Sequence, residues 1–107
     1  MSRIVIVGAI SVPAEQRTAL LEEARPMIEA AREEEGCIEY SFLPDPFDGS
    51  IVRIVEEWRS NEDLIEHFTF PHTKAVGELI GRAGAERLQI TKHLVTWSGS
   101  VSDDPGS

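Results

Sequence analysis

The stretch that decides the fold is CIEYSFLPDPFDGSIVRIVEEW, residues 37–58. Apolar and polar side chains alternate in its first seven residues, which is the pattern of a half-buried strand. One face of that strand would carry Ile38, Tyr40 and Phe42. The segment PDPFDGS, residues 44–50, is rich in proline, aspartate and glycine, which favour turns, and the β-branched run after it is typical of a second strand. The stretch therefore predicts an antiparallel hairpin.

The segment before this hairpin predicts a strand followed by a helix. Residues 3–10, RIVIVGAI, are apolar at both parities, so both faces of this strand are expected to be covered. From Pro13 to Glu35 the apolar period becomes helical, and Gly36 would end the helix. The apolar stripe of this helix consists of Leu20, Ala24, Ile28 and Ala31.

The segment after the hairpin predicts two short helices and a last strand. Ser60 stands three residues before Asp63, as in a capping box, and Pro71 suits the first turn of a further helix. Residues 87–97, RLQITKHLVTW, alternate as in a strand, with Leu88, Ile90 and Leu94 on one face. The polar tail, residues 98–107, has no periodicity and is expected to fray.

The order strand, helix, strand, strand, helix pair, strand is the split βαβ arrangement of ferredoxin-like folds. We therefore expect an α+β fold, with one domain over residues 1–97 and a four-stranded antiparallel sheet covered by helices on one face. The uncovered face would also be partly apolar, because the first and last strands carry apolar residues at both parities. A second subunit should cover it, which predicts a homodimer.

Composition and charge exclude several classes of function. The net charge of −9 would repel nucleic acid, and no apolar run reaches the roughly 20 residues needed to cross a membrane. The start, MSRIVIVGAIS, lacks the features of a signal peptide, so we expect a cytoplasmic protein. Cys37 is the only cysteine, so neither an internal disulfide nor a thiolate metal cluster is expected.

The element order and three motifs resemble the antibiotic biosynthesis monooxygenase family. The motifs are Gly36-Cys37 with Tyr40, the EEW of residues 56–58, and the spacing of His67 to Pro71-His72. The resemblance implies a dimeric α/β barrel. It also implies a cofactor-independent monooxygenase that oxidises an electron-rich phenolic, quinol or polyketide-like molecule with O2. The alternatives are a non-catalytic dimer that binds a small molecule, and an isomerase of the related barrel families.

The same resemblance disfavours haem breakdown. Haem-degrading relatives rely on an asparagine in the first strand, a tryptophan in a helix and a histidine that binds iron. Here the only asparagine is Asn61, His67 aligns with the tryptophan, and Gly77 stands at the histidine. We therefore expect no cofactor.

His67 and His72 are the candidate catalytic residues. Lining an apolar pocket, a neutral imidazole could remove a phenolic proton. Tyr40, Phe68 and Phe70 are candidate substrate-binding walls, as is Trp58 unless it is a core anchor. The histidines could instead be structural, at a helix start or half-buried against the sheet.

We expect no metal at these histidines, because Pro71 separates them and no third ligand follows at a matching spacing. The other acidic motifs are expected to have structural roles. Glu56 and Glu57 point to opposite faces, so they cannot act as a carboxylate pair. One of them is expected to be buried and paired with Arg53 or Arg59. The run Glu33–Glu35 is read as a solvated helix end.

Overall fold

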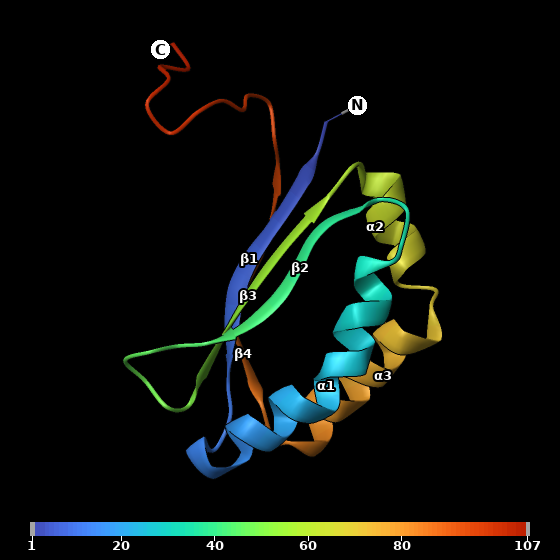
Figure 1. The fold of residues 1–107 in the computed structure, drawn as a ribbon, viewed down its shortest axis with the longest axis vertical. Helices are drawn as coiled ribbons and strands as arrows, with labels where there is room; N and C mark the ends of the chain where they lie inside the picture. The colour runs from blue at the N-terminus through green and yellow to red at the C-terminus, as the bar shows by residue number, and fades with distance from the viewer. Residues whose placement is uncertain (1, 107) are drawn as a thin grey trace.

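The computed structural model describes residues 2–106, in which three α-helices cover one face of a four-stranded antiparallel sheet (Figure 1). The strands are β1 (Ile4–Ser11), β2 (Cys37–Pro44), β3 (Ile51–Trp58) and β4 (Glu86–Leu94). The helices are α1 (Arg17–Arg32), α2 (Asn61–His67) and α3 (Pro71–Arg82), and a short 3-10 helix, η1 (Ala14–Gln16), precedes α1. The strand order is β2-β3-β1-β4, so the predicted α+β ferredoxin-like arrangement is confirmed.

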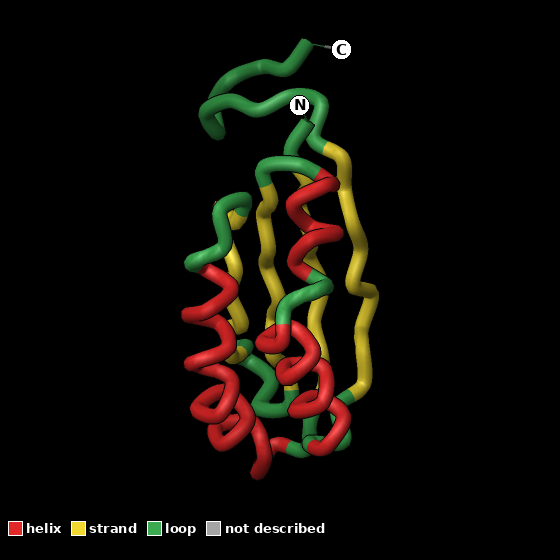
Figure 2. The backbone as a smooth tube through the Cα atoms, turned by 90° about the vertical axis from the view of Figure 1, so that its right-hand side faces the viewer, coloured by secondary structure: helices red, strands yellow, loops and turns green. Residues whose placement is uncertain are grey.

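The helices form one layer against the sheet (Figure 2). Leu20, Ala24 and Ala31 of α1 are buried, as their spacing predicts. The helix ends at Arg32 rather than Glu35, and Glu33 and Glu34 continue it only as a turn, donating to the carbonyls of Ala30 and Ala31. This early end matters for the site, because it turns the Glu34 side chain toward α2 and α3.

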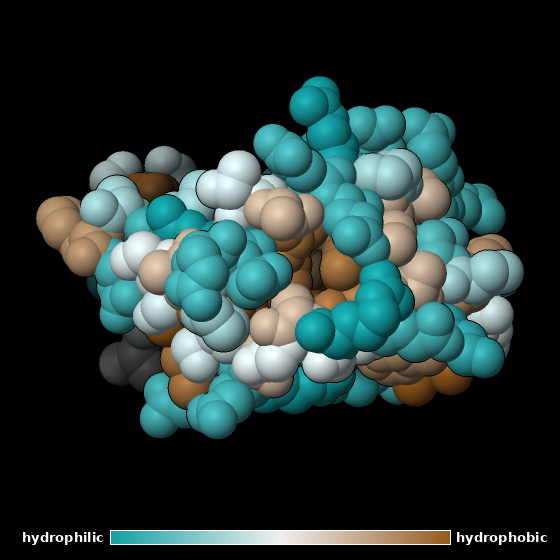
Figure 3. Space-filling model, turned by 90° about the horizontal axis from the view of Figure 1, so that it is seen from below, coloured by the Kyte–Doolittle hydropathy of each residue, from teal (hydrophilic) through white to brown (hydrophobic). Residues whose placement is uncertain are grey.

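The core consists of two clusters between the sheet and the helices. The first holds Ile10, Val12, Leu20, Ala24, Val52, Ile54 and Leu79. The second holds Ile4, Ile6, Ala31, Tyr40, Trp58 and Leu64, and the candidate site is built on it. Seen from one end, the surface is largely hydrophilic, and a hollow near its middle exposes hydrophobic residues (Figure 3).

Two irregularities in strand pairing change which side chains share a face. The β2–β3 register shifts between Cys37 and Glu39, so Cys37 packs against the second cluster while Ile38 is 51% exposed. The prediction that Ile38 shares a face with Tyr40 and Phe42 was therefore wrong for Ile38. A bulge moves one strand out of step with its partner, and alternation within a single strand does not reveal it.

The second irregularity lies where β4 pairs with β1. Its register shifts between Val7 and Ala9, and Gln89 adopts a positive φ of 48°. As a result Leu88 lines the open face of the sheet while Ile90 packs against the core, so the two do not share a face as predicted. Gly8 allows this close approach, because a Cβ there would lie 2.5 Å from the Cα of Ile90.

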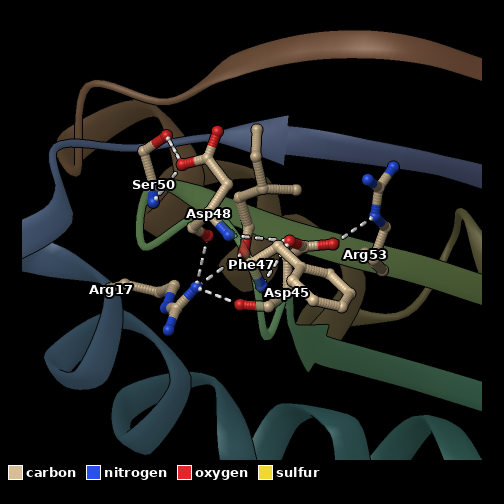
Figure 4. A network of polar contacts seen from close by, with 7 residues as sticks. Arg17, Asp45, Phe47, Asp48, Ser50 and Arg53 are labelled. Carbon is tan, nitrogen blue, oxygen red and sulfur yellow. Dashed lines mark hydrogen bonds and ion pairs between the residues drawn. The ribbon is translucent and has the colours of Figure 1, made fainter.

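The turn between β2 and β3 is held by hydrogen bonds rather than by apolar packing (Figure 4). The guanidinium of Arg17, at the start of α1, donates to the carbonyls of Asp45, Asp48 and Ile51 at 3.0, 2.8 and 3.1 Å. The Asp45 carboxylate accepts from the backbone N–H groups of Phe47 and Asp48, and these bonds together with Arg53 hold its pKa below the usual range. The hairpin is thereby tied to the first turn of α1.

The face of the sheet away from the helices carries a broad hollow of about 970 Å³. Its apolar lining includes Val7, Ala9, Ile51, Val55 and Leu88. This is the apolar face that the sequence predicts, and its cover by a second subunit stays a prediction. Among residues 2–106, none of the helices combines the length and the apolar character that crossing a membrane requires.

Candidate functional site

The site begins with α2, whose start is fixed by side chains. The Ser60 hydroxyl accepts from the backbone N–H of Asp63 at 3.2 Å, which is the cap that the sequence predicts. Arg59 donates to both oxygens of the Asp63 carboxylate at 2.8 and 2.9 Å and holds its pKa below the usual range. This anchored start determines where the last residue of the short helix lies.

That last residue is His67, and its imidazole is 3% exposed. The ring lies against the buried aromatic residues of β2 and β3, with centroid distances of 4.5 Å to Trp58 and 5.4 Å to Tyr40. A ring in such a place has little contact with water, so its polar contacts are with other groups of the protein.

The partner of His67 is Glu34, which the turn after α1 brings to the same place. Its Oε2 lies 2.7 Å from Nδ1 of His67 and 2.6 Å from Nε2 of His72, and its side chain is only 7% exposed. Glu34 is thus not part of a solvated helix end as expected. If both rings are neutral, each imidazole donates one N–H to the shared carboxylate oxygen, and Nε2 of His67 is then left as an acceptor.

The start of α3 positions the second histidine. Pro71 occupies the first turn of α3, as predicted, and the Phe70 ring before it stacks on His72 at 5.3 Å with an interplanar angle of 11°. The Thr73 hydroxyl donates to the His67 carbonyl at 2.6 Å and lies 3.4 Å from Nε2 of His67. These contacts join the end of α2 to the start of α3.

A cavity of about 180 Å³ lies between the sheet and the helices, with His67 in its wall. Tyr40 and Phe68, two of the candidate substrate-binding residues, are part of its lining. Phe70, His72 and Trp58 lie outside its lining: the first two stack on each other, and Trp58 is 0% exposed in the core. The rest of the lining comprises Ile6, Ile10, Phe42, Ile54, Glu56, Thr73, Val76, Gly77, Ile80, Arg87 and Ile90.

Burial changes the acid–base behaviour of two groups in this cavity. Desolvation raises the pKa of Glu56, partly offset by a hydrogen bond of 3.0 Å from Nε1 of Trp58. Desolvation also raises the pKa of Tyr40 well above its ordinary value, with the carboxylates of Glu56 and Glu34 adding to the effect. Tyr40 is therefore a proton donor here rather than a phenolate.

The expected pairing of Glu56 or Glu57 with Arg53 or Arg59 was wrong. Glu57 pairs with Arg3 at 2.9 Å, on the side of the sheet away from the helices. Arg53 and Arg59 pair with Asp45 and Asp63.

Sequence reasoning missed four polar residues of the site, namely Glu34, Glu56, Thr73 and Arg87. A signal for Glu34 does exist, because it stands three residues after Ala31 and so continues the buried stripe of α1. A carboxylate on an apolar stripe indicates a buried partner. The other three are brought to the cavity by sheet and helix packing, for which the sequence pattern has no signal.

The arrangement supports two kinds of chemistry. A histidine oriented by a buried carboxylate can take a proton from a molecule in the cavity. The site also brings together three groups that can bind a metal ion, with one oxygen of Glu34 and one nitrogen each of His67 and His72 within 4.8 Å of one another. Glu34 is therefore the third metal-binding group that the sequence analysis did not find.

Known proteins match this chain in sequence and in fold. A protein of Synechocystis sp. described as uncharacterized is 33% identical over 69 residues, which cover 64% of this chain and 47% of the relative. The chain thus spans about half the length of that curated relative. A candidate antibiotic biosynthesis monooxygenase from Deinococcus radiodurans has a similar structure, with a TM-score of 0.82, 20% identity and coverage of 94% of this chain and 99% of that one. A similarly described protein from Nitrosomonas europaea has a TM-score of 0.71 at 17% identity, covering 95% and 94% of the two chains.

The similarity to these solved structures shows that the chain has the same fold. The family of the chain is shown by its sequence. The model of the family described as antibiotic biosynthesis monooxygenase matches residues 3–79, which include β1 to β3, α2 and the His67 and His72 pair. The chain therefore belongs to the antibiotic biosynthesis monooxygenase family.

Proposed function

We propose that this protein is a cofactor-independent monooxygenase that oxidises a single-ring phenol or hydroquinone with O2. The observation that carries the proposal is the pairing of buried Glu34 with His67, whose ring lies in the wall of a largely apolar cavity. Membership of the monooxygenase family supports the same reaction class.

In this proposal His67 is the general base. Glu34 accepts the Nδ1–H of His67 and holds the ring, so that Nε2 takes the phenolic proton. The imidazolium that forms stays paired with the Glu34 carboxylate. Arg87, which lines the same cavity, supplies a positive charge for the phenolate.

The phenolate then reduces O2 without help from a bound cofactor. One electron passes from the ring to O2, and the resulting superoxide and ring radical combine to form a ring peroxide. Cleavage of its O–O bond leaves one oxygen atom on the ring as a quinone carbonyl. The other oxygen atom departs as water, which takes up the phenolic proton and the proton of the oxidised ring carbon. Glu56, whose pKa burial raises, can return a proton to the departing oxygen.

The size of the cavity indicates the size of the substrate. An apolar cavity of about 150 Å³ accommodates benzene, and this one is about 180 Å³. A hydroquinone fits that volume, whereas a polyketide with several fused rings would require the helices to move. We therefore propose monocyclic substrates for this chain.

Oxygen uptake with a panel of hydroquinones tests the proposal. We expect chelator-treated protein to consume O2, and His67→Gln to lower turnover by about a hundredfold or more, the usual contribution of a general base. His72→Gln should lower it less, because His72 lies outside the cavity lining. Glu33 provides a control, since it is exposed beside Glu34 and Glu33→Gln should leave turnover unchanged. Binding without O2 uptake would indicate a binding protein, and conversion without O2 uptake an isomerase.

A further inference from the structure

We propose that Glu34, His67 and His72 form a site for one divalent transition-metal ion, of which Zn²⁺ is the best fit, and that the bound ion blocks His67 as a base. Metal binding is independent of the reaction proposed above, whereas the blocking of His67 rests on it.

The three donor atoms suit zinc in kind. Two imidazole nitrogens and one carboxylate oxygen are a common zinc-binding set, with a fourth position left for water. The donors come from three segments of the chain, namely the turn after α1, the end of α2 and the start of α3. Their convergence therefore results from the fold and not from one helical repeat.

Two of the three separations between donor atoms require only a small movement, and the third, between the two histidine nitrogens, is at most 4.8 Å. Zinc binds nitrogen and oxygen at about 2.0–2.2 Å, which in a tetrahedral site places its ligands about 3.3 Å apart. Nδ1 of His67 and Nε2 of His72 lie 2.7 and 2.6 Å from Oε2 of Glu34. Each separation must therefore open by roughly 0.6–0.7 Å. Because Glu34 stands in a turn and not inside α1, its side chain can make this adjustment.

The surroundings also allow an ion to reach the three donors. His72 is 20% exposed while Glu34 and His67 are nearly buried, so an ion can enter from the side of His72.

Metal binding and the proposed base function exclude each other. In the proposed reaction Nδ1 of His67 carries a proton and Nε2 accepts one. When the ion takes Nδ1, the ring proton must move to Nε2, which then cannot accept the substrate's proton. Zinc would therefore inhibit the enzyme rather than assist it.

Calorimetric titration of the metal-free protein with Zn²⁺ tests the site, and the visible spectrum of added Co²⁺ gives a second readout of the donor set. We expect one ion per chain. Glu34→Gln and His72→Gln should each weaken binding at least tenfold, because each removes a direct ligand. Two matched controls, Glu33→Gln and His93→Gln, change exposed groups and should bind like the wild type. Circular dichroism would confirm that each variant folds.

The outcomes separate the two proposals. Binding that is absent, or equally strong in wild type, Glu34→Gln and His72→Gln, would overturn the metal site whatever the activity. Binding as expected, with no O2 uptake by the metal-free protein, would support the metal site and contradict the proposed reaction. If both hold, one equivalent of Zn²⁺ should suppress O2 uptake, and uptake that persists at saturation would refute the blocking of His67.

Discussion

Replacing Glu34 by glutamine should destabilise the fold measurably. Oε2 of Glu34 accepts hydrogen bonds from two imidazoles at 2.7 and 2.6 Å, and the side chain is 7% exposed. Hydrogen bonds to a charged group contribute about 1.5–3 kcal/mol each, and a neutral replacement about 1 kcal/mol. Glutamine keeps the shape and one acceptor oxygen but loses the charge, so we expect the free energy of unfolding to fall by about 2–3 kcal/mol. For a chain of this length the melting temperature would fall by roughly 8–15 °C.

Thermal unfolding followed by circular dichroism measures this change. Wild type and variant must be compared at equal protein concentration, because dimer formation would make the melting temperature depend on concentration. Glu33→Gln is the matched control, since Glu33 is exposed in the same turn, and it should melt within about 2 °C of wild type, as surface substitutions usually do. If Glu34→Gln melted with this control, the buried carboxylate would not stabilise the site as we argue.

Three further predictions concern other parts of the molecule. Because burial raises the pKa of Glu56, its ionised form is disfavoured in the fold, so Glu56→Gln should raise the free energy of unfolding at pH 7. In a urea titration that gain should shrink as the pH falls and wild-type Glu56 is protonated; no gain at pH 7 would contradict the reasoning. Desolvation raises the pKa of Cys37 to about 11, so iodoacetamide should alkylate it at pH 8 at least about tenfold more slowly than free cysteine, and an equal rate would show an accessible thiolate. Light scattering at micromolar concentration should give twice the 11.9 kDa chain mass, because the apolar hollow of the open sheet face needs a cover, and a stable monomer would refute that cover.

Much of the fold follows from local patterns in the sequence. The β-branched run of residues 51–58 forms β3 with the predicted bounds, and Ser60 and Pro71 open α2 and α3 as their chemistry predicts. These features depend on neighbours within a few residues. The two register shifts do not, because a bulge depends on the partner strand, and so the faces of Ile38 and Leu88 were assigned wrongly.

In the candidate site, too, the features that depend on local spacing could be predicted, and those that depend on distant residues could not. His67 could be placed near the cavity because it follows Leu64 by about one helical turn and α2 must bury Leu64. Its pairing with Glu34 joins residues 33 positions apart, and the contact of Glu34 with His72 joins residues 38 apart. No periodicity links positions so far apart, although Glu34 by itself continues the buried stripe of α1.

The measurement that tests the central claim most directly is the fate of isotopically labelled O2 in a single-turnover reaction of chelator-treated protein with a hydroquinone. The account predicts that one labelled oxygen atom appears in the quinone product and the other in water. It also predicts that His67→Gln, folded by circular dichroism, loses this incorporation at a matched time. Incorporation that is unchanged in His67→Gln, or that requires an added metal ion or flavin, would contradict the account.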